Sequence, residues 1–354
     1  MLMNRRQAIG IGLQAAIGAV GSTVCDGKTA PQNPATRAPL MLGGRRVRTV
    51  DIHAHCVIPE AMELIPGARA NPPSLVLGPQ RLRDMDAQGI DVQVLSINQF
   101  WYAAPRDVAG RVVDLQNEKL AEMCAAQPSR FVPLASVALQ YPDLAAKQLD
   151  RAVRELGMHG VAIAAHVNGD ELASPKFHPF WAKAEELGAV VFIHPQAIPE
   201  LEARLRGNGG LANVIGNPLD TTIALSHLIF EGTLDAFPSL TICAAHGGGY
   251  LGSYRARSDH GCVSAPGAEC SRALKKAPSE YMKQIYIDSI VFTSEALRHL
   301  IAESGADHVL LGTDYPYTWN PTAVDHVLQT PGLSDADRVA MLGGNAARLL
   351  GLAK

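Results

Sequence analysis

The sequence contains little of what nucleic-acid-binding proteins need. Only 5% of its 354 residues are aromatic, no run of basic residues occurs, and the formal net charge is −3. Binding to phosphates requires a basic surface, and stacking against bases requires aromatic side chains. We therefore expect no nucleic-acid partner.

Zinc-finger motifs and long apolar runs are also missing. The six cysteines form no C-x-x-C pair and show no zinc-finger spacing, which argues against the usual structural zinc sites. No apolar run reaches the about 20 residues of a membrane-spanning helix, so we expect no membrane span in the mature chain. Apolar residues make up 47% and charged residues 18%, a balance typical of a globular protein with a large core.

The N-terminus has the layout of an export signal. Asn4-Arg5-Arg6-Gln7 precedes an apolar, glycine-rich stretch over 8–24 and a segment rich in proline, threonine and alanine up to residue 39. This layout is typical of the twin-arginine route, which carries folded proteins to the periplasm. We predict that residues 1–45 are an export signal and a disordered linker. The alternative is an untargeted tail on a cytoplasmic protein.

Beyond residue 45, short β-branched runs alternate with longer amphipathic segments. The candidate strands cover 49–53, 92–97, 131–137, 160–164, 190–194, 241–245, 285–288 and 309–313. Amphipathic segments include 108–127, 143–156, 177–187, 221–237 and 294–304, and 335–353 resembles a closing helix.

Eight apolar strands that alternate with helices predict an α/β protein whose parallel sheet closes as a (β/α)8 TIM barrel. We expect one such domain over 46–354. A doubly wound open sheet is the alternative, but it would normally carry a glycine-rich phosphate turn after its first strand. Here the first strand is followed by histidines instead.

The first candidate strand runs into Asp51-Ile52-His53-Ala54-His55. Side chains two residues apart on a strand point to the same side, so both imidazoles can face one point at the barrel mouth. An H-x-H pair alone is a weak signal, because many such pairs are structural. Its position at the end of the first strand makes the pair a candidate for metal ligation.

Ligand-type residues also end three later strands. His194 ends the strand 190–194, His246 follows 241–245, and Asp314 follows 309–313. Barrel active sites are built from the C-terminal ends of the strands. We therefore expect these three side chains to converge with His53 and His55.

Three histidines and one aspartate in this set, His53, His55, His194 and Asp314, are predicted to bind one divalent metal ion. Zn²⁺ is the default for nitrogen and carboxylate ligands, with Mn²⁺, Fe²⁺ and Co²⁺ as alternatives. The fourth strand, 160–164, ends without a lysine that could be carbamylated to bridge two ions, which favours a mononuclear site. No organic cofactor is expected.

His246 remains outside this ligand set. We predict that it acts as a general acid and base on substrate or water, with a role as a further metal ligand as the alternative. Three glycines follow it, and their lack of side chains would let substrate approach the backbone closely.

These stretches together resemble a known family. Asp-Ile-His-Ala-His at 51–55, Phe-Ile-His-Pro at 192–195, Ala-Ala-His-Gly-Gly-Gly at 244–249 and Leu-Gly-Thr-Asp-Tyr-Pro at 311–316 are similar to signature stretches of the amidohydrolase superfamily. The branch that they resemble contains the decarboxylases related to aminocarboxymuconate-semialdehyde decarboxylase. Over roughly residues 49–352, the resemblance implies the metal ligands named above, catalytic roles for His246 and Asp314, and a homodimer.

In the namesake enzymes an arginine eleven residues after the catalytic histidine binds the substrate carboxylate across the dimer interface. Arg257 stands at this position with Arg255 nearby, and a guanidinium fork fits a carboxylate; a solvated loop pair is the alternative. Two further expected arginines are missing, one from the shortened stretch between His55 and Arg81 and one at Ala265. The substrate is therefore not expected to be aminocarboxymuconate semialdehyde itself.

The resulting hypothesis is metal-dependent, non-oxidative decarboxylation of a small aromatic or unsaturated carboxylic acid. Trp101, its neighbours Phe100 and Tyr102, and Trp319 are candidates to line the ring pocket, with ordinary packing as the alternative. The same ligands also suit hydrolysis of a lactone, amide or ester by metal-bound hydroxide. A third possibility is a binding protein on a scaffold that has lost activity.

Overall fold

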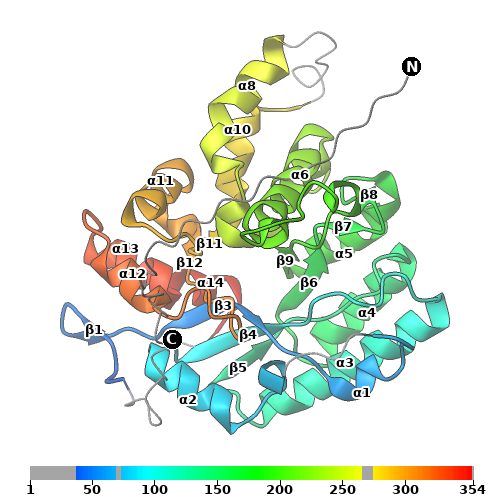
Figure 1. The fold of residues 1–354 in the computed structure, drawn as a ribbon, viewed down its shortest axis with the longest axis horizontal. Helices are drawn as coiled ribbons and strands as arrows, with labels where there is room; N and C mark the ends of the chain where they lie inside the picture. Colours follow the sequence, from blue (N-terminus) through cyan, green and yellow to red (C-terminus); the bar gives the residue numbers. More distant parts are fainter. Residues whose placement is uncertain (1–36, 69–72, 265–273, 353–354) are drawn as a thin grey trace, which may run out of the picture. The chain divides into compact units, whose positions relative to one another are not determined.

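The computed structural model describes residues 37–68, 73–264 and 274–352. Eight strands, all joined in parallel, form the centre of the fold (Figure 1). They are β3 (Val50–His55), β4 (Val92–Ser96), β5 (Phe131–Pro133), β6 (Gly160–Ala164), β9 (Val190–His194), β10 (Thr241–Ala244), β11 (Ile285–Asp288) and β12 (Val309–Leu310). The eight predicted strands are confirmed, and the differences lie at their ends.

Hydrogen bonds join the strands into a barrel. β3, β4 and β5 pair in one group, and β6, β9, β10, β11 and β12 pair in another. At one seam the Ile52 N–H donates to the Leu311 carbonyl over 2.9 Å, and at the other the Ala135 N–H donates to the Gly160 carbonyl over 2.8 Å. The (β/α)8 prediction is therefore confirmed.

Helices follow the strands along the chain, as the alternation in the sequence predicts. The main ones are α2 (Pro79–Gln88), α3 (Arg106–Ala125), α4 (Pro142–Arg154), α5 (His178–Leu187), α6 (Asn217–Phe230), α11 (Ser294–Ser304) and α12 (Ala323–Gln329). The others are α1 (Pro59–Met62), α7 (Thr233–Ala236), α8 (Arg255–Ser264), α10 (Pro278–Tyr281), α13 (Asp335–Val339) and α14 (Asn345–Leu349). Two small hairpins add β1 (Met41–Leu42) with β2 (Arg45–Arg46), and β7 (His166–Val167) with β8 (Asp170–Glu171).

Two hydrophobic clusters divide the core. The cluster inside the barrel takes buried side chains from every strand except β11, whose half-buried Tyr286 packs against it. Ala346 of α14 and Leu350, which follows this helix, also belong to the cluster. The larger cluster lies between the strands and the surrounding helices. Because the strands are buried on both faces, their sequences are continuously apolar until the polar residues at their C-terminal ends.

The predicted closing helix over 335–353 is interrupted. α13 and α14 are separated by one wider turn, Ala340–Gly344. A Cβ atom on Gly343 would lie 2.0 Å from the Arg48 carbonyl oxygen, so only glycine permits this approach to the chain just before β3.

The N-terminal expectations meet the structure only in part. The twin-arginine motif and the apolar stretch after it lie outside the described residues. Residues 41–46, however, form the β1–β2 hairpin, and Arg37 makes an ion pair of 2.6 Å with Asp325, so these residues are not a free linker. In the part of the chain that the structure describes, no helix combines the length and apolar character needed to cross a membrane.

Candidate metal centre and active site

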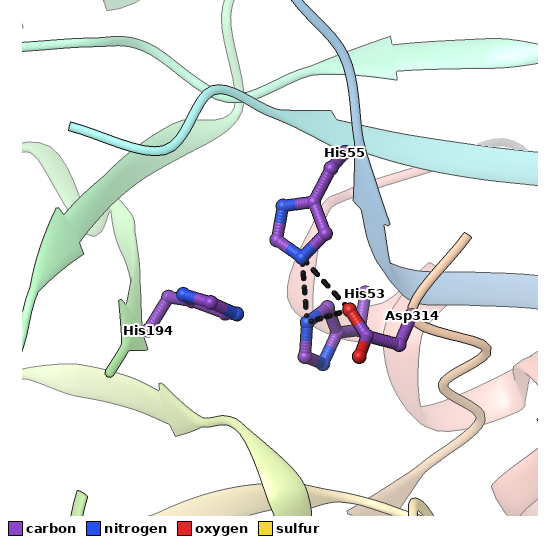
Figure 2. A group of neighbouring side chains, drawn as sticks. All are labelled: His53, His55, His194 and Asp314. Carbon is purple, nitrogen blue, oxygen red and sulfur yellow. Dashed lines mark hydrogen bonds and ion pairs between the residues drawn. The ribbon is translucent and has the colours of Figure 1, made fainter. Parts of the chain in front are cut away.

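The four predicted metal ligands meet at the C-terminal end of the barrel. His53 Nε2 and His55 Nε2 lie 2.9 Å apart, and Asp314 Oδ1 is 3.3 Å from the first and 3.0 Å from the second. His194 points at this group from the other side (Figure 2), and one ligand atom from each residue lies within 4.8 Å of the others. None of the four residues exposes more than 8% of its surface.

This donor set fits a single metal ion. Nitrogen and oxygen ligands at about 2.0–2.2 Å from one ion lie about 3 Å from each other, which is the spacing found among His53, His55 and Asp314. Two imidazole nitrogens that face each other at hydrogen-bonding distance would be poorly matched without a proton or a cation between them. The prediction of this metal site is confirmed.

A local irregularity in β3 brings both histidines inward. Val50 and Ile52 belong to the cluster inside the barrel, yet the His53 ring also contacts Phe192 of that cluster, with ring centroids 5.0 Å apart. Two consecutive inward residues break the alternation of a regular strand, and the pairing of β3 with β4 indeed shifts register between Asp51 and Ala54. The shift places His53 and His55 at the metal position.

Asp314 is held by the seam between β12 and β3. Its backbone N–H donates to the His53 carbonyl over 2.9 Å, and the preceding Thr313 donates its hydroxyl to Asp51 over 2.6 Å. Asp314 also has a φ of 61°, in the left-handed region that non-glycine residues seldom adopt. Such backbone strain is concentrated at functional sites.

The charges of the four residues are coupled. Burial lowers the pKa of His53, but the carboxylates of Asp314 and Asp288 outweigh this effect and raise it to about 10. Burial lowers the pKa of His55 to about 4 and that of His194 well below its usual value. Burial favours the neutral form of Asp314, yet the surrounding histidines hold its pKa far below the usual range.

These shifts predict that metal binding at neutral pH releases one proton, from His53. His55 and His194 are already neutral and Asp314 is already ionised, so only His53 must lose a proton to offer its Nε2. The metal association constant should therefore rise by about tenfold per pH unit between about pH 6 and 8. Calorimetry in buffers of different ionisation enthalpy measures the release directly, and an affinity that does not change with pH would contradict it.

His246 lies beside the four ligands. Its Nε2 is 3.7 Å from Asp314 Oδ2, and its buried Nδ1 has no hydrogen-bond partner among the described residues. Its φ of 54° is again left-handed. This position suits a group that exchanges a proton with substrate next to the metal ligands.

The glycines after His246 serve the packing of the loop. A Cβ atom on Gly249 would lie 2.2 Å from the Pro218 carbonyl oxygen and 2.5 Å from the Thr222 hydroxyl of α6. The loop therefore lies tightly against α6. Gly249 also lines a cavity beside the metal ligands, so the expectation that these glycines let substrate approach the backbone stays a prediction.

Two cavities open beside the metal ligands. One, of about 480 Å³, is lined by His246 and Asp314 together with apolar side chains that include Phe292 and Trp319. The other, of about 390 Å³, is lined by His55 and includes Phe100 in its wall. Only the first presents both predicted catalytic residues.

Comparison with known proteins gives the family. A family model described as amidohydrolase matches residues 50–352. The chain belongs to the amidohydrolase superfamily. Within it, the chain is 32% identical over 277 residues to 2-amino-3-carboxymuconate-6-semialdehyde decarboxylase of Dictyostelium discoideum, covering 77% of this chain and 76% of that protein. This places it in the branch that the sequence motifs resemble.

Two solved structures of decarboxylases are similar to this amidohydrolase over most of their length. That of 5-carboxyvanillate decarboxylase from Sphingomonas paucimobilis has a TM-score of 0.79 at 25% identity, with 87% of this chain and all of the other covered. That of dihydroxybenzoic acid decarboxylase from Polaromonas sp. JS666, with bound manganese and the inhibitor 2-nitroresorcinol, has a TM-score of 0.75 at 26% identity and covers 87% and 98%.

Trp101 does not line either cavity of this amidohydrolase. Its side chain is fully buried in the outer core, and its indole N–H donates to the Val137 carbonyl over 2.9 Å. Our assignment of Trp101 to substrate binding is corrected to packing. Of its neighbours, Tyr102 is also buried in the core, whereas Phe100 reaches a cavity wall.

Replacing Trp101 by alanine is expected to destabilise the fold by about 3–5 kcal/mol, because it leaves a large cavity. The KM of the folded variant should stay unchanged, since the ring does not line the cavity that holds His246 and Asp314. Denaturant unfolding and steady-state kinetics together measure both effects. A raised KM with unchanged stability would restore the substrate role.

The two arginines differ in their surroundings. Arg255 forms an ion pair of 2.7 Å with Glu303 and also donates to the carbonyl of that residue, so its guanidinium is engaged away from the metal and the assignment to substrate is corrected. Arg257 is exposed on α8, which projects from the barrel (Figure 1). Within one chain it lines neither cavity beside the metal.

Sequence reasoning missed two residues at the site. Asp288 is fully buried at the end of β11 and lies 2.6 Å from His53 Nδ1. It follows an apolar run, as the identified candidates do, so the same signal could have found it. Phe292, four residues further on, carried no signal, because one aromatic residue in a loop shows no pattern.

Proposed function

We propose that this protein is a metal-dependent, non-oxidative decarboxylase of a small aromatic carboxylic acid. The observation that carries the proposal is the cavity of about 480 Å³ in which an apolar, partly aromatic wall faces His246 and Asp314 beside the metal ligands. The similar enzymes named above are decarboxylases, and two of them act on benzoic acids according to their names.

The reaction replaces a carboxylate by a proton. When bound, a divalent cation supplies electrostatic stabilisation to the electron-rich form of the substrate. His246, beside Asp314, is positioned to deliver a proton to the ring carbon that bears the carboxylate. The C–C bond then breaks, its electron pair returns to the ring, and carbon dioxide leaves, so that no oxidant is needed.

Incubation with a panel of hydroxybenzoic acids and lactones tests this function. We expect release of carbon dioxide and formation of the corresponding phenol, and release about 10²–10⁴-fold slower by the His246→Asn variant. Ring opening or ester cleavage without carbon dioxide would overturn the decarboxylase and favour the hydrolase.

We propose that the substrate ring occupies the cavity beside His246. Replacing Phe292 by alanine should then raise the KM by about tenfold, because lost aromatic contact costs about 1.5 kcal/mol. Phe100→Ala, in the cavity beside His55, is the matched control and should leave the KM unchanged. The opposite pattern in steady-state kinetics would place the ring beside His55.

The metal is proposed to be Zn²⁺ or Mn²⁺. Three imidazoles and one carboxylate suit zinc, whereas the similar dihydroxybenzoic acid decarboxylase contains manganese. Metal analysis of the protein as purified, followed by reconstitution with each ion, distinguishes them through the activity that each restores.

We further propose a homodimer in which Arg257 reaches the substrate carboxylate of the partner subunit. Its exposure on a projecting helix supports this role. Sedimentation gives the oligomeric state. Arg257→Ala should raise the KM and leave the oligomeric state unchanged.

For the proposed twin-arginine export, cell fractionation of a variant with Arg5 and Arg6 both replaced by lysine is the direct test: retention in the cytoplasm supports export.

A further inference from the structure

Asp288 occupies a central position beneath the metal site without belonging to it. Its carboxylate is fully buried at the end of β11. It contacts His53 through Nδ1, the nitrogen on the other side of the ring from the Nε2 that faces the ligands. Asp288 is therefore placed behind His53 and not among the metal ligands.

The first contact fixes the chemical form of a ligand. Asp288 Oδ2 lies 2.6 Å from His53 Nδ1, and a carboxylate can only accept at this position, so Nδ1 carries a hydrogen. The lone pair of the neutral ring then lies on Nε2, where His55 and Asp314 converge. Outer partners of this kind orient histidine ligands and set their tautomer.

The same carboxylate also holds the loop of His246. Oδ2 accepts the His246 backbone N–H over 2.9 Å, and Oδ1 accepts that of Gly247 over 2.9 Å and that of Ile290 over 3.0 Å. These bonds fasten the loop at the residue whose φ is 54°. A left-handed residue persists only where its surroundings enforce it.

We propose that Asp288 is a positioning residue that couples the metal ligand His53 to the proton-transferring residue His246. One buried carboxylate sets the tautomer of the first and the backbone conformation of the second. The proposal rests on the metal site and not on the identity of the substrate.

Asp51 provides a matched comparison. It is also fully buried and also accepts four hydrogen bonds, from the backbone N–H groups of His53 and Thr313 and from the side chains of Thr313 and Gln93. None of its donors is an imidazole. Replacing either aspartate by asparagine removes one negative charge and leaves some of the hydrogen bonds that the carboxylate accepted with two donors facing each other. Only Asp288→Asn changes a hydrogen bond to the imidazole ring of a metal ligand, His53.

The test compares metal affinity with stability in these two variants. In Asp288→Asn the amide NH2 must face either His53 and His246 or the N–H groups of Gly247 and Ile290. The first arrangement turns His53 to the tautomer with a hydrogen on Nε2, and the second leaves the loop unfastened. We expect chelator competition to show an affinity about 10–100-fold lower than in the unaltered protein. Asp51→Asn should lower the melting temperature of the metal-free protein similarly, with a much smaller loss of affinity.

Nuclear magnetic resonance of the zinc-loaded protein gives a second readout. With ¹⁵N-labelled histidine, the hydrogen on His53 Nδ1 should appear as a strongly downfield proton bonded to nitrogen, and it should be unchanged in Asp51→Asn. In Asp288→Asn it should be absent in the first arrangement and less far downfield in the second, where a neutral amide oxygen replaces the carboxylate as acceptor. Equal affinity losses in the two variants, or none in Asp288→Asn, would reduce Asp288 to a structural role. If Asp288→Asn does not fold, the spectrum of the unaltered protein decides, because the absence of any such proton overturns the proposal.

Discussion

Replacing His246 is expected to lower kcat by about 10²–10⁴-fold, the usual contribution of a positioned acid or base, while the metal content stays unchanged. The imidazole nitrogen lies 3.7 Å from Asp314 and does not belong to the group of four ligand atoms. Loss of the ring therefore removes the proton donor without removing a ligand. Activity assays and metal analysis of the same preparation measure the two effects.

The choice of substituent matters because His246 has a left-handed backbone. Alanine at this φ adds a strain of about 1–2 kcal/mol, whereas asparagine tolerates the conformation. His246→Asn thus separates lost chemistry from a distorted loop. His166→Ala, at a half-buried histidine in the wall of a separate cavity, is a control that should keep full activity. Loss of metal from His246→Asn would make His246 a ligand instead.

Removal of the metal is expected to abolish turnover and to destabilise the protein. A cation that provides about 4 kcal/mol of transition-state stabilisation accounts for about a 10³-fold rate, so dialysis against a chelator should leave no measurable activity. Loss of an ion present at about 100 times its Kd removes about 2.7 kcal/mol of stability, which corresponds to a melting temperature lower by about 4 °C for a chain of this size.

Reconstitution completes this experiment. One equivalent of Zn²⁺ or Mn²⁺ per chain should restore both activity and melting temperature, because the ligand atoms form a single group. A requirement for two equivalents would contradict a mononuclear site. Calcium is the matched control ion, since it prefers oxygen ligands and should restore neither property.

The sequence predicted the barrel and its metal ligands because both depend on local patterns. Continuous apolar strands end in ligand-type residues, and a barrel brings the ends of its strands to one face. This reasoning placed His194 and Asp314 near each other although they are far apart in the chain. It required no knowledge of side-chain rotation.

Features that depend on distant contacts were not predictable. Whether Trp101 turns into the core or into the cavity is decided by the Val137 carbonyl, and Arg255 is engaged by Glu303, 48 residues further on. The shift of register in β3 also leaves no pattern in the sequence. The choice between zinc and manganese stays open for a different reason, since the ligands present suit both ions.

The seam of the barrel also determines when the metal can be bound. His55 and Asp314, whose ligand atoms lie 3.0 Å apart, are separated by 259 positions along the chain. A nascent chain that has not yet been extended to Asp314 cannot assemble the site, however well its earlier strands have formed. Loading with the ion therefore follows synthesis of the chain as far as Asp314 and the pairing of this segment with β3.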